Sequence, residues 1–248
     1  MLDFNPSPTP SAHGEVLCRD DGADLVDEKT YRSIVGSLIF LTHTRPDITY
    51  LVSLVSRYMT NPSKIHMKAA KRILRYVKGT LNFGIHYYSS EKFNLVGFSD
   101  SDWGGSLDDR KSTSGNCFSF GSGSITWSSK KQSIVALSST EAEYVAVTSA
   151  GTQALWLRKF LEEIREKEIL PTVIYCDNVS AIKLAKNPVY HSRTNHFDLK
   201  YHFIRDLVQK KEIELKHINT QHQLADIFTK AVAKDQFLAL RDKIVNPH

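Results

Sequence analysis

Four acidic residues of this 248-residue chain stand at the edges of different expected elements: Asp100, Glu143, Asp177 and Asp226. If carboxylates converge from such distant parts of a sequence, they cannot all stay ionised without compensating positive charge. Hard oxygen ligands in this number favour Mg²⁺ or Mn²⁺, and two such ions would polarise a phosphodiester for in-line attack by water. The four acids therefore predict a two-metal hydrolytic site, provided that the fold brings them together.

Glu143 is the most informative of the four because its helix has a readable phase. The apolar residues of the helix share a face with Glu143 at i, i+3, i+4 and i+7 spacing: Ala146, Val147, Ala150, Ala154, Leu157 and Leu161. A carboxylate on a buried face is costly to desolvate without an opposing cation, which favours a metal ligand. Glu141 lies on a more mixed face and fits the capping acid of Ser138. We therefore expect Glu143 to be functional and Glu141 to be structural.

Each of the other acids has a plain structural alternative. Asp100 ends the strand-like run LVGFSD and could simply open a turn. Asp177 follows the apolar run TVIYC and could cap the next helix, and Asp226 could balance a helix dipole. Asp102 lies two residues after Asp100 and on the same side if the strand continues. We expect it to orient the metal ligands without binding the metal itself.

Three zones follow one another along the chain. Residues 1–27 are rich in Pro, Ser, Asp and Gly, which predicts a disordered segment. Residues 28–90 predict three helices: one over 29–43, one opening with Pro46 and one after Pro62-Ser63. Residues 91–242 predict a meander of three antiparallel strands, a helix over 139–167, and then strands alternating with helices. This order predicts an α/β fold with a mixed sheet flanked by helices.

A net charge of +5 and a pI near 9.0 favour a polyanionic partner. Lys71, Arg72 and Arg75 lie on the third expected helix. They form either a solvated basic face or a surface that binds a nucleic-acid backbone. Further candidates for phosphate contacts are Arg110, Lys111, Lys130, Lys131 and Arg193. Three widely spaced cysteines favour a reducing compartment, and neither a membrane span nor a secretory signal is visible. We expect an intracellular protein of the cytoplasm or nucleus, without a membrane partner or a small-molecule cofactor.

A succession of motifs carries a resemblance to a known family. The segments LVGFSDSDWGG, ITWSSKKQ, ALSSTEAEYVAV, IYCDNVSAIKLAKNP, HSRTNHFDLKYHFIRD and QLADIFTK resemble, in order and spacing, the C-terminal ribonuclease H domain of copia-type retrotransposon Pol polyproteins. The preceding segment, from YRSIVGSLIF to RILRYVKGTL, resembles the helical connection that follows the reverse transcriptase in these polyproteins. Together the two resemblances cover about residues 31–240.

The resemblance implies a ribonuclease H-like fold with a five-stranded mixed sheet. It also implies two-metal endonucleolytic hydrolysis of the RNA strand of RNA–DNA hybrids, with two Mg²⁺ ions for which Mn²⁺ can substitute. By position, Asp100, Glu143, Asp177 and Asp226 match the catalytic, metal-binding acids of the family. The implied partners are the RNA–DNA hybrid and the reverse transcriptase part of a polyprotein.

Two departures from the family pattern keep a second function open. Neither His217 nor His222 clearly supplies the mobile histidine that many ribonucleases H carry before the last aspartate, and Asn195 stands where the family commonly has lysine. The chain also lacks a YxDD-like polymerase signature. The alternative is a catalytically silent ribonuclease H-fold remnant that serves as a nucleic-acid or protein interaction module, reused by a host or as a pathogen effector. Retention of all four acids favours the enzyme.

Overall fold

The structure, a computed structural model, describes residues 4–12, 14–89, 94–164, 170–186 and 195–247. Its α-helices are α1 (Glu28–Leu41), α2 (Thr49–Ser56), α3 (Lys64–Gly79), α4 (Ser139–Glu163), α5 (Val179–Lys186), α6 (Asn195–Gln209) and α7 (Lys234–Arg241). Short 3-10 helices are η1 (Pro46–Ile48), η2 (Thr220–His222) and η3 (Leu224–Phe228). The strands are β1 (Phe83–Gly84), β2 (Leu95–Ser101), β3 (Thr113–Phe120), β4 (Gly123–Lys131), β5 (Thr172–Cys176), β6 (Ile213–His217) and β7 (Asn246–Pro247).

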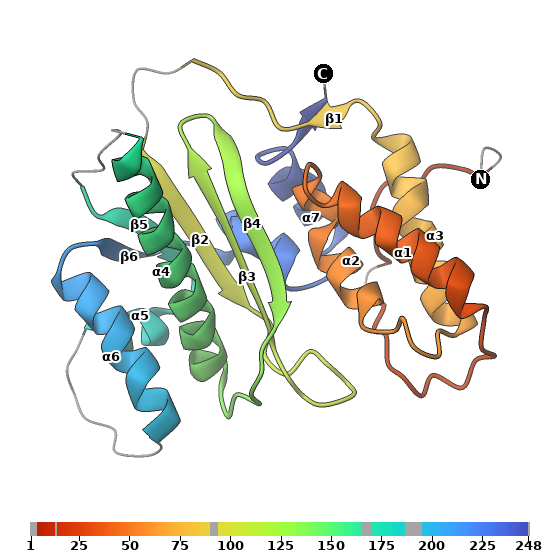
Figure 1. The fold of residues 1–248 in the computed structure, drawn as a ribbon, viewed down its shortest axis with the longest axis horizontal. Coiled ribbons are helices and arrows are strands. Elements are labelled where there is room, and N and C mark those ends of the chain that lie inside the picture. The colour runs from red at the N-terminus through yellow and green to blue at the C-terminus, as the bar shows by residue number, and fades with distance from the viewer. Residues whose placement is uncertain (1–3, 13, 90–93, 165–169, 187–194, 248) are drawn as a thin grey trace.

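A mixed sheet of five strands forms the centre of the molecule, in the order β4-β3-β2-β5-β6 (Figure 1). Strands β2, β3 and β4 pair antiparallel as a meander, whereas β2, β5 and β6 run parallel to one another. The expected α/β fold with a five-stranded mixed sheet is therefore confirmed, and its architecture is ribonuclease H-like. The parallel pairing matters for the site because it places the carboxyl ends of β2 and β5 side by side.

Helices cover both faces of the sheet. On one face α4, α5 and α6 pack over alternate strand residues such as Phe118, Ile174 and Leu215. Residues of the opposite parity, such as Cys117 and Trp127, face the other layer, which contains α1–α3, η3 and α7. This alternation is the period of two that each strand imposes on its side chains. Asp100 shares the parity of Phe98, which packs in the second layer, so its side chain leaves the sheet on the side of η3.

The helical segment, which comprises α1, η1, α2 and α3, and the C-terminal end of the chain share one core. Buried residues of α1–α3 cluster with Phe228, Phe237 and Val245, although these positions are far apart in the sequence. Strand β1 pairs antiparallel with β7, and the Trp127 Nε1 group on β4 donates to the Thr42 carbonyl at 3.0 Å. The segment over residues 28–90 therefore packs directly on the sheet and on the C-terminal helices.

The described N-terminal residues contact the helical segment. Between residues 4 and 27, the structure places Ser7 and Leu17 in buried positions against the helical segment. The Arg75 guanidinium on α3 donates to the Asn5 carbonyl at 2.7 Å, and the Tyr58 hydroxyl donates to the Leu17 carbonyl at 2.8 Å. Donors elsewhere in the chain thus satisfy part of the backbone of a segment that has little apolar periodicity of its own.

Candidate metal centre

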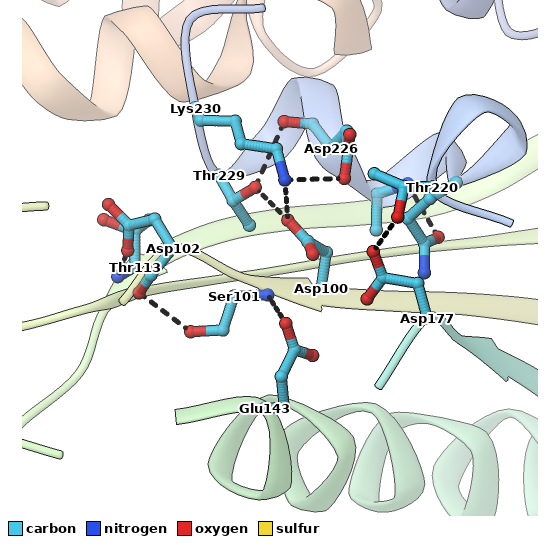
Figure 2. A network of polar contacts seen from close by, with 12 residues as sticks. Asp100, Ser101, Asp102, Thr113, Glu143, Asp177, Thr220, Asp226, Thr229 and Lys230 are labelled. Atoms are coloured by element: carbon cyan, nitrogen blue, oxygen red, sulfur yellow. Dashed lines mark hydrogen bonds and ion pairs between the residues drawn. The ribbon is translucent and has the colours of Figure 1, made fainter. Parts of the chain in front are cut away.

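Asp100 and Asp177 are brought together by strand register. Phe98 on β2 is paired with Tyr175 on the parallel strand β5, and each aspartate lies two residues beyond its member of this pair. Asp100 is 1% exposed at the end of β2, whereas Asp177 is half-buried and accepts a hydrogen bond from the Thr220 hydroxyl at 2.8 Å (Figure 2). The structure thus gives both aspartates the strand-end positions expected from the sequence.

Asp226 reaches the same place from η3, a short 3-10 helix. Carboxylate oxygens of Asp100, Asp177 and Asp226 all lie within 4.8 Å of one another. Asp226 is fully buried, and the Gln236 side chain donates to its Oδ2 at 3.1 Å. Three acids from three separate elements therefore converge at one edge of the sheet.

Two residues position η3 against the sheet. Gln223 is buried, and its side chain donates to the Ser99 carbonyl at 2.9 Å and accepts from the Ala225 N–H at 3.2 Å. Gly115 lies opposite Asp100 on β3, where a Cβ atom would stand 2.7 Å from Thr229 Cγ2 and 2.8 Å from Phe228 Cβ. The close approach of η3 to β3 therefore requires glycine at position 115. The sequence analysis identified neither residue.

Glu143 approaches the cluster from α4, with the phase that its helix predicts. It is 6% exposed, and all six apolar residues that share its face are buried. Its Oε1 accepts from the Ser101 N–H at 3.2 Å, and the Cys176 thiol lies 3.8 Å from its Oε2. Glu143, Cys176 and Asp177 form a second group with ligand atoms within 4.8 Å of one another. Asp177 is common to both groups.

Glu141 and Asp102 lie outside these two groups. The Glu141 carboxylate accepts from the Leu137 N–H at 2.6 Å, and its own N–H donates to the Ser138 hydroxyl at 3.2 Å, so it caps α4. Asp102 accepts a hydrogen bond from the Thr113 N–H on β3. Burial raises the pKa of Asp102 to about 6, although that hydrogen bond and the Arg57 charge oppose the shift. The Asp102 carboxylate therefore interacts both with Arg57 of the helical segment and with the acid cluster, which consists of Asp100, Glu143, Asp177 and Asp226.

A lysine and a threonine that the sequence analysis missed complete the cluster. The Lys230 ammonium lies 3.0 Å from Asp226 Oδ1 and 3.5 Å from Asp100 Oδ2, between the two carboxylates (Figure 2). The Thr229 hydroxyl donates to Asp100. Lys230 follows Asp226 by four residues, a spacing that often joins opposite charges, and this was the available sequence signal.

Burial and mutual repulsion dominate the electrostatics of the cluster. Burial raises the pKa of Glu143 well above its usual value, and the charges of Asp100 and Asp177 add to the shift. Burial and Asp100 raise the pKa of Asp226 to about 7, with Lys230 opposing. Burial lowers the pKa of Lys230, but Asp100 and Asp226 outweigh that effect and raise it above its usual range. The site therefore has more negative charge than one ammonium neutralises.

The donor set fits a hard divalent cation. Asp226 Oδ1 is buried and, among the residues that the structure describes, accepts no hydrogen bond apart from its ion pair with Lys230. Burial raises the pKa of the Cys176 thiol, with Glu143 adding to the shift, so the sulfur stays protonated and is a poor ligand. The remaining donors, from Asp100, Glu143, Asp177 and Asp226, are carboxylate oxygens, as Mg²⁺ and Mn²⁺ prefer.

The basic candidates occupy two separate regions. Arg110 and Lys111 lie in the loop between β2 and β3, near Lys130 and Lys131 at the end of β4, where Lys131 pairs with Asp109 at 2.7 Å. On α3, Arg72 donates to the Thr9 hydroxyl at 3.1 Å and Arg75 to the Asn5 carbonyl, while Lys71 lines a large cavity beside them. The two arginines of α3 therefore hold the N-terminal residues. Arg193 lies outside the described residues.

The two histidines named in the sequence analysis are exposed. His217 ends β6, and His222 lies in η2. The backbone of Asn195 begins α6, and the structure describes no side chain there.

None of the described helices combines the length and the apolar character that a membrane span requires.

Comparisons with curated proteins identify relatives of nearly the whole chain. It is 43% identical over 244 residues to the retrovirus-related Pol polyprotein from transposon RE1 of Arabidopsis thaliana, a match that covers 98% of this chain and 17% of the polyprotein. It is also 43% identical over 128 residues to the secreted RxLR effector protein 161 of Plasmopara viticola, covering 51% of this chain and 90% of that protein. The chain thus spans about a sixth of the length of the polyprotein it matches. No family model matches it.

Among solved structures, the chain is similar to LC11-RNase H1, crystallised in complex with an RNA/DNA hybrid. The TM-score is 0.39 at 14% sequence identity, over 52% of this chain and 88% of that one. The sequence relatives and the sheet architecture lead to one assignment: the chain belongs to the family of copia-type retrotransposon Pol polyproteins and has a ribonuclease H-like fold.

Proposed function

We propose that this chain is a metal-dependent ribonuclease H that hydrolyses the RNA strand of RNA–DNA hybrids. The observation that carries the proposal is the convergence of Asp100, Asp177 and Asp226 from β2, the end of β5 and η3, with Glu143 beside them on α4. Burial of carboxylates at this density destabilises the metal-free fold, and divalent cations would offset that cost. The solved LC11-RNase H1 complex contains the same class of substrate, an RNA/DNA hybrid.

The proposed cofactor is a pair of Mg²⁺ ions, with Mn²⁺ as a substitute. When bound, such ions polarise a scissile phosphate and activate water for in-line attack. The residues of the chain hold the ions and orient them: Asp177 belongs to both ligand groups, and Asp100 lies at the end of the central strand between Asp226 and Glu143. Hydrogen bonds from the Ser101 N–H, the Thr220 hydroxyl and the Gln236 side chain fix carboxylate orientations.

Contacts with the hybrid are proposed for the basic residues around the β2–β3 loop and the end of β4. Arg110, Lys111, Lys130 and Lys131 carry charge suited to backbone phosphates, which set affinity but not sequence preference. The proposed wider partner is the reverse transcriptase part of a Pol polyprotein, because the chain matches a segment of such a polyprotein.

Cleavage of a labelled RNA–DNA hybrid tests the proposal. The purified chain is assayed in Mg²⁺, in Mn²⁺ and in a chelator, beside DNA–DNA and RNA–RNA duplexes. Asp100→Asn is expected to abolish cleavage because it removes a ligand while it keeps the side-chain volume, and Glu141→Gln is the matched control on α4. Cleavage that survives Asp100→Asn, or that is lost equally in both variants, would contradict the assignment of the site.

A second candidate is an interaction module that keeps the fold without turnover. Similarity of half of the chain to a secreted effector protein of Plasmopara viticola favours it, because that relative is named for a role other than hydrolysis. Absence of cleavage by a folded chain in both metals would support this module, whereas hybrid-specific cleavage would exclude it as the whole function.

A further inference from the structure

Lys230 lies among the acids, although a set of metal ligands would not require a lysine there. Its ammonium contacts one oxygen each of Asp226 and Asp100, at 3.0 and 3.5 Å. Those two oxygens, Asp226 Oδ1 and Asp100 Oδ2, belong to the carboxylates that form the first ligand group with Asp177. The ammonium therefore stands where a cation between these carboxylates would stand.

A lysine and a divalent ion cannot share this place. Both carry positive charge, and at separations of a few ångströms in a poorly solvated site like charges repel by several kcal/mol at an effective dielectric constant of about 20. An ion that takes Asp226 Oδ1 must therefore remove the ammonium from it. The lysine can move, because its side chain is 39% exposed whereas that of Asp226 is fully buried.

A cavity of about 220 Å³ is lined by the same lysine. Lys230 and Asp102 line it from the sheet side, and Tyr50, Arg57 and Tyr58 of the helical segment line it from the other. Arg57 donates to the Thr113 hydroxyl at 3.1 Å, which fixes its guanidinium at the cavity wall. If the Lys230 ammonium left Asp100 and Asp226, it would face this cavity together with Arg57 and with the carboxylates of Glu15 and Asp102.

We propose that Lys230 is a built-in counter-ion of the acid cluster when no metal is bound, that a divalent cation displaces it, and that its released ammonium then binds a backbone phosphate of the nucleic-acid strand beside Arg57. The proposal rests on the proposed metal-dependent nuclease function. Metal loading and substrate binding are then coupled: the ion that completes the acid cluster also releases a cation for the substrate. The coupling works in both directions, since a phosphate that holds Lys230 favours metal binding.

Metal affinity tests the first part of the proposal, the displacement of Lys230 by a divalent cation. Mn²⁺ binding is titrated by electron paramagnetic resonance of the free ion for the parent chain, Lys230→Gln, Lys230→Arg and the exposed control Lys234→Gln. Removal of the competing ammonium is expected to tighten Mn²⁺ binding in Lys230→Gln by about tenfold, which equals about 1.4 kcal/mol. Lys230→Arg, which keeps the charge, and Lys234→Gln are expected to stay close to the parent. Unchanged or weaker binding by folded Lys230→Gln would overturn the proposal.

A second measurement needs no variant and so does not depend on the folding of one. The rate at which an amine-reactive reagent labels Lys230 is followed by peptide mass spectrometry with and without Mn²⁺, and Lys234 serves as the internal reference. Displacement is expected to raise the labelling rate of Lys230 relative to Lys234 severalfold. An equal or lower relative rate with bound Mn²⁺ would mean that the ammonium stays with the acids, and the proposal would be wrong.

Salt dependence tests the second half. Binding of an RNA–DNA hybrid is measured against salt concentration in a chelator and in Ca²⁺, with the intact RNA strand checked on a gel. In Ca²⁺ the slope of log affinity against log salt is expected to be about one unit steeper for the parent than for Lys230→Gln, and equal for both in the chelator. Equal slopes in Ca²⁺ would exclude the phosphate contact. None of these assays requires turnover, so a chain without ribonuclease activity still decides between the outcomes.

Discussion

Asp226→Asn is expected to stabilise the metal-free protein although it damages the proposed site. The Asp226 carboxyl is fully buried beside Asp100, and its pKa rises from 3.8 to about 7. An acid whose pKa is higher in the folded state binds more protons there than in the unfolded chain. Its contribution to stability is therefore present at low pH and is lost as the pH rises from about 4 to about 7.

The size of the effect follows from the shift. A rise of about three pKa units corresponds to about 4 kcal/mol at pH 8, because each unit is worth 1.36 kcal/mol. Asparagine cannot ionise and avoids this cost, which already includes the opposing attraction of Lys230 at 3.0 Å, but its buried amide costs free energy wherever it is not hydrogen-bonded. The net gain expected for Asp226→Asn at pH 8 is therefore about 1–4 kcal/mol, and a chain of this size changes its melting temperature by roughly 2–4 °C per kcal/mol.

The assay is urea unfolding in EDTA at several pH values between 5 and 8, repeated with millimolar Mg²⁺. Asp226→Asn is expected to exceed the parent most at pH 8, with the difference shrinking toward pH 4. Mg²⁺ is expected to stabilise the parent more than the variant, because a ligand that binds only the folded state adds to its stability. Asp20→Asn, an exposed acid outside the cluster, is the matched control and should follow the parent.

The reasoning would be refuted if Asp226→Asn were the less stable protein at pH 8 in EDTA. Such a result would mean that Lys230 and the hydrogen bond from Gln236 outweigh the repulsion from Asp100. Equal stabilisation of parent and variant by Mg²⁺ would refute the second part, since it would place the metal elsewhere.

Three further outcomes are expected. Gly115→Ala should lower the free energy of unfolding by about 1–3 kcal/mol, measured by urea unfolding, because its methyl group pushes η3 away from β3. The same displacement should reduce hybrid cleavage by more than the lost fraction of folded protein accounts for, as measured in the cleavage assay. Gln223→Ala should cost about 1–3 kcal/mol through unsatisfied groups at Ser99 and Ala225, and should weaken Mg²⁺ stabilisation in the same unfolding assay. Burial lowers the pKa of His66 despite the opposing charge of Asp21, so unfolding curves should show stability falling as the pH drops below about 6.5, with the slope reduced in His66→Gln.

Local pattern was enough to predict positions that depend on one element. The buried position of Glu143 was predictable because the helix period alone decides which residues share its face. The strand-end positions of Asp100 and Asp177 were predictable because the apolar run of each strand ends beside them. The metal specificity, the nucleic-acid contacts and the individual catalytic roles remain predictions.

The parts that depend on tertiary contacts were not predictable from pattern. Asp226 lies in η3, whose position is set by Gln223 and Gly115 through contacts with β2 and β3, more than a hundred residues away in the sequence. The contacts of the N-terminal residues likewise involve donors such as Arg75 that composition does not connect to them. Lys230 was missed because four-residue spacing to an acid is common on any helical surface.

The placement of η3 also explains why the helical segment and the acid cluster belong together. Phe228 of η3 is fully buried in the core that α1–α3 share with α7, while Asp226, two residues earlier in the same 3-10 helix, lies close to Asp100. One face of η3 is therefore held by the helical segment and the other by β3, at the position where only glycine fits. A 3-10 helix of five residues has too few internal hydrogen bonds to hold its place alone. The geometry of the fourth acid thus depends on packing between two regions that the sequence analysis treated as separate domains.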